Sequence, residues 1–324
     1  MHTFIEELIR RHALDAAQAE RLWQLARLDA PPPQLRTGLQ RGLAVTAALL
    51  LGAALIFWVA ANWQHMALQT RLHLLEAAVL APAVLLALLA RARTALLLLT
   101  TLALGALLAF VGQTWQTGAD AWQLFATWAL LALPWALLAR HDGLWALWLL
   151  IAGAGLFAWA GAPLGLQVLW AQDGPTSLRR YLELLLWAAL FLLPLALSAT
   201  GLMRQQRPTL SWSTAALLAL TAWSADGIFN LLGRHTDAQF LLCALLVAGA
   251  VLLAWRRQPR EYSVLALALM AANAMGLSTL GWWLFQGGND FAAGRMLALT
   301  LVAAVSTGLS MRWLYRLQAR DAPA

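Results

Sequence analysis

His73 and Glu76 stand three residues apart at the start of an apolar run, a spacing that puts both side chains on one face of a helix. An imidazole beside a carboxylate can relay a proton or supply two ligands to a bound group. A carboxylate at a wet helix end, paired with an arginine such as Arg71 or Arg295, gives the same pattern and has no chemical role. The sequence leaves both interpretations open.

Other polar side chains stand at similar positions, beside or just inside the ends of long apolar runs. Ionisable groups at membrane depth are costly and mark functional sites by default. We therefore interpret these side chains as a vestibule that binds a small-molecule solute, and assign no catalytic residue, metal ligand or cofactor. The predicted vestibule residues are Asn62, His73, Glu76, Gln113, Gln116, Asp120, Asp226, Asn230, Asp290 and Arg295.

Several motifs that carry known chemistry are missing from the sequence. It contains no H-E-x-x-H zinc motif, no G-x-x-x-x-G-K-[ST] phosphate loop, no G-x-S-x-G nucleophile elbow and no C-x-x-C pair. Cys243 is the single cysteine, so one chain has neither a disulfide framework nor a cysteine-based metal site. These observations argue against zinc proteolysis and nucleotide hydrolysis, and an enzyme is not the favoured class.

The composition is that of a membrane protein. Hydrophobic residues make up 61% of the chain and charged residues only 11%, against about 45–50% and about 25% in soluble domains. The net charge is +7, and all 22 basic residues are arginines. These arginines stand at the ends of apolar runs, where they set topology, so nucleic-acid binding is rejected and the lipid bilayer is the expected partner.

Ten apolar runs, separated by charged or turn-forming residues, predict the transmembrane helices. The fold class is therefore all-α, a polytopic helical membrane protein with about ten transmembrane helices in residues 42–314 and a cytoplasmic tail at 315–324. The runs cover residues 42–61, 72–90, 94–112, 122–139, 144–161, 181–199, 210–231, 239–255, 262–286 and 291–314.

The arginines also predict the orientation. With a cytoplasmic N-terminus, 17 of the 22 arginines fall on the cytoplasmic side, as the positive-inside rule expects. Eight acidic residues leave that side at +9, whereas five arginines and seven acids leave the other side at −2. Both termini are therefore predicted to be cytoplasmic. Six tryptophans are expected at the opposite membrane interface: Trp63, Trp115, Trp122, Trp223, Trp282 and Trp283.

Residues 1–41 predict a short cytoplasmic helical hairpin and a proline spacer. Thr3 with Glu6, and Asp15 with Gln18, have the spacing of a capping box, which starts a helix. The segment lacks the basic start and apolar core of a cleavable signal peptide, so the first apolar run is expected to be an uncleaved anchor. The hairpin either lies on the inner membrane surface or contacts a protein partner.

A parallel four-helix repeat is a further expectation. Residues 116–120 (QTGAD) resemble residues 286–290 (QGGND), and each segment follows a run that leads out of the cytoplasm. The repeat units would be residues 42–139 and 210–314, with residues 144–199 between them.

Proline and glycine positions predict how individual helices are shaped. Pro82, Pro134 and Pro194 stand near the middle of the second, fourth and sixth runs, where proline removes a backbone donor and kinks a helix. Gly153 and Gly155 in the fifth run are expected to let another helix approach closely.

Two motifs resemble a known family. The first run ends in FWVAANW at 57–63 and the third in GQTWQTGAD at 112–120. Together with the N-terminal hairpin, they are similar to the bacterial integral-membrane family called domain of unknown function 2157. The resemblance covers roughly residues 1–160. It implies a bacterial inner-membrane protein but no particular activity.

Three classes of function remain open from the sequence. A transport-like or solute-binding protein would use the vestibule to admit a polar or cationic solute. A non-catalytic envelope accessory or sensing component would use the N-terminal hairpin for partners. A membrane-embedded enzyme acting on lipid or envelope substrates would use two carboxylates near the interface as acid and base. We favour the first class, because the polar side chains gather at one predicted membrane face.

Overall fold

A computed structural model describes residues 9–26, 35–62, 65–89, 92–115, 118, 120–161, 177–204, 207–232, 237–286 and 292–321. Gln116 and Asp290 of the predicted vestibule, and the Thr3–Glu6 pair, lie outside these residues. The second predicted capping box is confirmed. The Gln18 amide N–H donates to Asp15 Oδ1 at 2.7 Å, and the Asp15 N–H donates to Gln18 Oε1 at 3.3 Å. This pair caps the short helix α2 (Ala16–Ala26).

Ten long helices follow α2 in the described part of the chain, and each overlaps one predicted run. They are α3 (Leu35–Asn62), α4 (Leu68–Leu88), α5 (Arg93–Thr114), α6 (Ala121–Ala139), α7 (Asp142–Ala160), α8 (Ser177–Ala199), α9 (Thr209–Leu232), α10 (Asp237–Arg256), α11 (Tyr262–Phe285) and α12 (Ala292–Asp321). Among the described residues, nine helices are long and apolar enough to cross a membrane. The helix outside this set is α4, whose first turns hold Arg71, His73 and Glu76. The all-α, polytopic membrane fold is confirmed.

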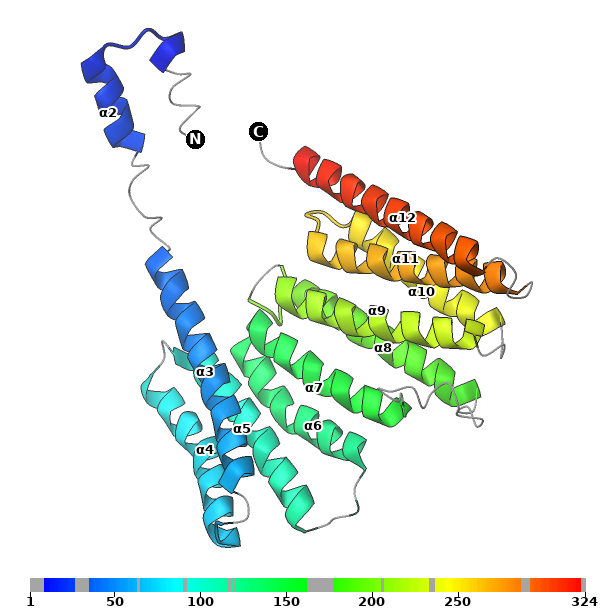
Figure 1. Ribbon diagram of the computed structural model, residues 1–324. Helices are drawn as coiled ribbons and strands as arrows, with labels where there is room; N and C mark the ends of the chain where they lie inside the picture. Colours follow the sequence, from blue (N-terminus) through cyan, green and yellow to red (C-terminus); the bar gives the residue numbers. More distant parts are fainter. Residues whose placement is uncertain are drawn as a thin grey trace.

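The helices form two groups joined by α7 (Figure 1). In the first group α5 packs against α3, α4 and α6, and in the second α9 packs against α8, α10 and α11. The bridging helix α7 contacts α5 and α6 on one side and α8 and α9 on the other. Because successive helices alternate in direction (Figure 1), the N-terminus of α8 lies at the same end of the bundle as the C-terminus of α9.

Glycines let α7 approach both groups, as the sequence predicts. A Cβ added at Gly153 would stand 2.8 Å from Leu218 Cδ1 of α9, and one added at Gly155 would stand 3.1 Å from Phe125 Cβ of α6. Both glycines are buried. The absence of two side chains therefore fixes the distance of α7 from its neighbours.

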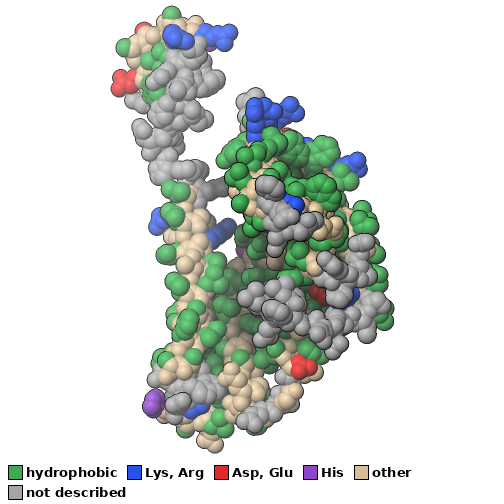
Figure 2. Space-filling view, turned by 45° about the vertical axis from the view of Figure 1, so that its right-hand side comes forward, with side chains coloured by type: hydrophobic (Ala, Val, Ile, Leu, Met, Phe, Trp, Pro, Cys, Tyr) green, Lys and Arg blue, Asp and Glu red, His purple; other side chains and the backbone are tan. Residues whose placement is uncertain are grey.

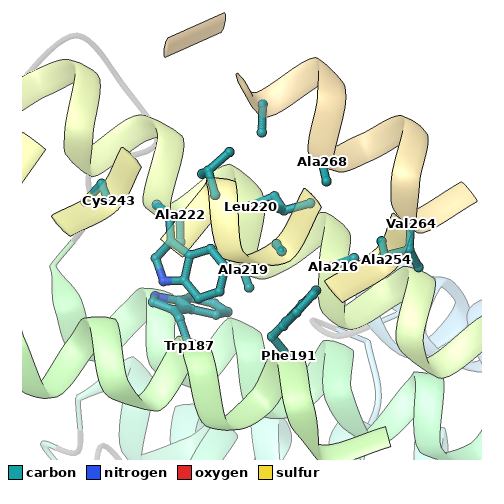
Figure 3. Packing of buried hydrophobic residues seen from close by; sticks show 14 of the residues in the cluster. Trp187, Phe191, Ala216, Ala219, Leu220, Ala222, Cys243, Ala254, Val264 and Ala268 are labelled. Carbon is teal, nitrogen blue, oxygen red and sulfur yellow. The ribbon is translucent and has the colours of Figure 1, made fainter. Parts of the chain in front are cut away.

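The largest hydrophobic core surrounds α9 (Figure 3). Figure 3 shows Ala216, Ala219 and Ala222 of α9 among alanines of α10 and α11, with Trp187 and Phe191 of α8 beneath them. Small side chains on α9 let four helices close around it. Half of an apolar 18-residue stretch of α9 is consequently buried, whereas no residue of the corresponding stretch of α12 is.

The outer surface of the bundle is apolar. Figure 2 shows hydrophobic side chains over most of the visible face, with arginines and acidic residues as small isolated groups. On α12, Leu297, Leu301 and Leu309 are each more than 60% exposed. Leucines are exposed to this extent where lipid, not water, covers the surface.

The predicted interfacial position of Trp223 is wrong. Its side chain is 2% exposed and packs on Phe191, with ring centroids 5.7 Å apart. The cause is helix packing, because α8 covers the face of α9 that carries this indole. Trp115, in contrast, is 52% exposed at the end of α5.

The predicted repeat units have related packing. In residues 42–139 the first and third, second and third, and third and fourth helices pack together, and the same pairs pack in residues 210–314. The first two helices also pack together in the second unit, through α9 and α10. This correspondence agrees with a duplication, which stays a prediction.

The contact between α7 and α6 predicts the effect of filling Gly155. A Gly155→Leu variant should lose about 1–3 kcal/mol of stability, because the new side chain has no free volume beside Phe125. Gly249→Leu on α10 is the matched control, since nothing lies within 4 Å of its Cβ position. Thermal unfolding in detergent compares the two variants. Equal melting temperatures would contradict close packing at Gly155.

Candidate functional site

Asp226 and Asn230, both predicted from the sequence, lie one turn apart on α9 and contact each other. Asn230 Nδ2 donates to the Asp226 carbonyl oxygen at 2.7 Å and to Asp226 Oδ1 at 3.1 Å. Gln239 of α10 donates through Nε2 to the other carboxylate oxygen, Oδ2, at 2.8 Å. The carboxylate of Asp226 is therefore held by amides from two helices.

The same two amides connect Asp226 to a cation on α8. Arg180 Nη1 donates to Asn230 Oδ1 at 3.1 Å and to Gln239 Oε1 at 3.0 Å. Each amide thus turns its oxygen to the guanidinium and its nitrogen to the carboxylate, so the charges at both ends fix its orientation. We call Arg180, Asp226, Asn230 and Gln239 the α8–α10 network.

The two amides of the network are buried, and its two charged members, Arg180 and Asp226, are half-buried. Asn230 and Gln239 are each 7% exposed. A buried charge is costly unless it is paired and hydrogen-bonded, and a buried amide is costly if its hydrogen bonds are lost. Removing any member would take a hydrogen-bond partner away from at least two other members.

Two further groups border the network. Cys243 of α10 is fully buried, and its Sγ lies 3.5 Å from Asp226 Oδ2. Glu183 stands one turn beyond Arg180 on α8 and is close enough to Asp226 for the two carboxylates to repel each other. Two carboxylates, Asp226 and Glu183, therefore stand near two arginines, Arg179 and Arg180.

A second polar feature is an open hollow of about 680 Å³ between the ends of α6, α7 and α8. It lies at the end of the bundle where α8 begins. We call it the α6–α8 hollow, and its lining residues are Asp120, Ala121, Trp122, Ala158, Trp159, Gly161, Leu178, Arg179 and Leu182. Asp120, the residue before α6, accepts a hydrogen bond from Trp122 Nε1 at 3.3 Å.

The other predicted residues lie elsewhere on the bundle. His73 Nδ1 and Glu76 Oε2 are 3.1 Å apart on α4, and both side chains are well exposed. Gln113 is exposed near the end of α5, and Arg295 lies in the first turn of α12. Figure 1 shows α4 and α12 on opposite sides of the bundle, so Glu76 and Arg295 do not share a pocket. Asn62 is the last residue of α3.

Sequence reasoning missed Arg179, Arg180 and Gln239 as site residues. The two arginines stand just before an apolar run, so they were interpreted as charges of a loop. Gln239 stands at the start of a run and has no ionisable side chain. A weak signal was present, since Asp226 and Asn230 share one face of α9 and need donors or a cation opposite them. Among the described residues, no group of three His, Cys, Asp or Glu side chains is arranged to hold a metal ion.

Asp142 forms a structural junction at the opposite end of the bundle. The side chain of this residue, the first of α7, is 3% exposed. Its Oδ2 accepts from the Leu210 N–H at 2.7 Å, and its Oδ1 accepts from the Ser211 N–H at 3.0 Å. Asp142 therefore caps the N-terminus of α9 from a neighbouring helix, where a negative charge is favourable.

His141 supports the same junction. Its Nδ1 accepts from the Gly143 N–H at 3.1 Å, a bond that requires the neutral imidazole. Burial lowers the pKa of His141, Arg41 lowers it further, and Asp142 opposes the shift. The ring is therefore held in the neutral form that can accept this bond.

Removing the Asp142 carboxylate should destabilise the fold. Asp142→Ala leaves the amides of Leu210 and Ser211 without an acceptor, at a cost of about 1–3 kcal/mol. Asp120→Ala is the control, because Asp120 precedes α6 without making a side-chain capping bond. Thermal unfolding in detergent measures both. A smaller loss in Asp142→Ala than in Asp120→Ala would contradict the capping role.

Comparison with known proteins gives a match to a family model. No curated protein and no solved structure matches the chain. Residues 6–145 match the family model described as predicted membrane protein (DUF2157), which confirms the resemblance seen in the sequence. The match covers α2 to α6 and the first turn of α7, whereas the α8–α10 network lies beyond it. The N-terminal part of this chain is therefore similar to the DUF2157 predicted membrane proteins.

Proposed function

We propose that this chain is a transport-like, solute-binding protein of a bacterial inner membrane, with both termini in the cytoplasm. The α8–α10 network is the observation that carries the proposal. The positive-inside distribution of arginines supports the orientation, which puts the network and the α6–α8 hollow at the non-cytoplasmic end.

The position of the network supports a solute-binding role. It joins the first turn of α8, the last turns of α9 and the first turn of α10, inside helices whose other buried side chains are mostly apolar. Polar groups at such positions mark substrate or ion pathways in membrane proteins. Charged groups of both signs, Arg180 with Asp226 and Glu183, suit a polar solute.

Passage across the membrane would require movement. Beyond the network, Trp187 and Phe191 of α8 and Trp212 of α9 belong to the hydrophobic core, and each of these side chains is at most 3% exposed. A polar solute would have to pass this core. Transporters commonly solve this by moving one helix group against another around a fixed site. The two groups joined by α7 are the natural units of such a movement.

The N-terminal segment supports a second, subordinate role. The capping box at Asp15 and Gln18 gives α2 its own start signal outside the bundle. A helix with its own cap can present side chains to another protein. We assign partner contact to this segment as an accessory function.

Flux measurements test the main proposal. Purified protein in liposomes should take up at least one compound from a panel of sodium, potassium, choline, putrescine and the common amino acids. Asp226→Asn should lower that uptake about tenfold, which corresponds to about 1.4 kcal/mol of lost interaction. Asp226 accepts two amide donors, and the substituted side chain offers one acceptor oxygen instead of two.

The matched control is Glu261→Gln at the opposite end of the bundle. Glu261 precedes α11 and makes no side-chain capping bond. Its variant should keep normal uptake. Absence of uptake for every compound, together with no ligand-dependent rise in melting temperature that is lost in Asp226→Asn, would overturn the proposal. Unchanged uptake in Asp226→Asn would remove the network from the site.

A further inference from the structure

The α6–α8 hollow has oppositely charged side chains on its wall. Arg179 lies in the first turn of α8, and Asp120 immediately precedes α6. Neither residue belongs to the α8–α10 network. We propose that this hollow binds a small zwitterion, a molecule that carries a primary ammonium and an anionic carboxylate or phosphate group.

Arg179 is fixed in place with donor capacity to spare. Its guanidinium lies over the Trp159 ring, 5.0 Å from the centroid, and Nη2 donates to the Trp159 carbonyl oxygen. Nε is buried and has no hydrogen-bond partner. The Arg179 side chain also lines the hollow, where an anionic group could bind the guanidinium through two oxygens.

Glu183 is the nearest competing acid on the same helix, four residues from Arg179. No ion pair within 4 Å joins the two side chains among the described residues. The donor face of Arg179 is therefore not taken by its own helix.

Asp120 supplies the opposite charge. Its Oδ2 accepts from Trp122 Nε1, and its side chain is otherwise exposed at the hollow. An anion alone would be repelled by Asp120, and a cation alone would be repelled by Arg179. A molecule with both charges can pair with Arg179 and Asp120 at once, which makes the site selective for zwitterions.

Size and surroundings agree with this class of ligand. Sites for small molecules have volumes of about 300–1,000 Å³, and the hollow measures about 680 Å³. Trp122 and Trp159 line it, and amphipathic indoles are common where membrane meets water. The same chemistry occurs in free amino acids and in an ethanolamine phosphate headgroup of a lipid, so the test must separate these sources.

Binding to the full chain in detergent tests the assignment. We expect β-alanine, γ-aminobutyrate or phosphoethanolamine to change tryptophan fluorescence in a saturable way and to raise the melting temperature. Acetate and ethylamine, which carry one charge each, should bind at least tenfold more weakly. In nanodiscs, phosphatidylethanolamine should give the same change and phosphatidylcholine should not. A response to the lipid alone would identify a headgroup site.

Variants tie the response to the hollow. Arg179→Gln and Asp120→Asn should each weaken binding about tenfold, and Arg179→Lys should weaken it less because it keeps the charge without the fork. Arg207→Gln, an exposed arginine at the opposite end, is the control and should bind normally. Equal binding by all variants, equal binding of acetate, or no response to any zwitterion or to the lipid would overturn the proposal.

This inference stands without the proposed transport function. The zwitterion site is tested by equilibrium binding that depends on Arg179 and Asp120, whereas transport is tested by flux that depends on Asp226. A negative result in either experiment does not decide the outcome of the other.

Discussion

Asp226 and Arg180 carry opposite charges at half-buried positions on mostly apolar helices, where an unpaired charge is costly. Two amides solve the problem by accepting from the guanidinium and donating to the carboxylate. An ion pair bridged in this way keeps every buried polar group satisfied. These hydrogen bonds form only when α8, α9 and α10 pack in one relative position along their axes. The contacts that offset the cost of desolvating the two charges therefore also define the packing of the second helix group.

The rest of the bundle follows from side-chain size. Alanines on α9 and glycines on α7 permit close approach, and the aromatic side chains of α8 fill the space that remains. In a bilayer, where lipid is as apolar as leucine, such packing and polar contacts hold helices together in place of the hydrophobic effect. Helix α12 packs against α11 at the edge of the bundle and keeps leucines toward lipid.

Much of this architecture is readable from the sequence. Apolar runs define the ten long helices, Asp15 and Gln18 define the start of α2, and Gly153 and Gly155 indicate the close contacts of α7. These features are local or depend on one helix at a time. The orientation and the repeat are likewise sequence predictions, and they stay so.

The site was less predictable because it depends on which helix faces which. Asp226 and Asn230 were identified from the sequence, but their partners lie on other helices. Arg180 precedes Asp226 by 46 residues, and Gln239 follows it by 13. Trp223 was placed at the interface by its neighbours in sequence, whereas α8 buries it. The spacing of residues along one helix predicts the face of that helix on which each residue lies. It does not predict which neighbouring helix packs against that face.

A double-mutant cycle between Arg180 and Asp226 tests the central claim most directly. Stability in detergent would be measured for the wild type, Arg180→Gln, Asp226→Asn and the double variant. Although the two side chains do not touch, the bridging amides should couple them, so the double variant should be less destabilised than the sum of the single variants by about 1 kcal/mol or more. Strictly additive losses would show that the two charges act independently and would contradict the network.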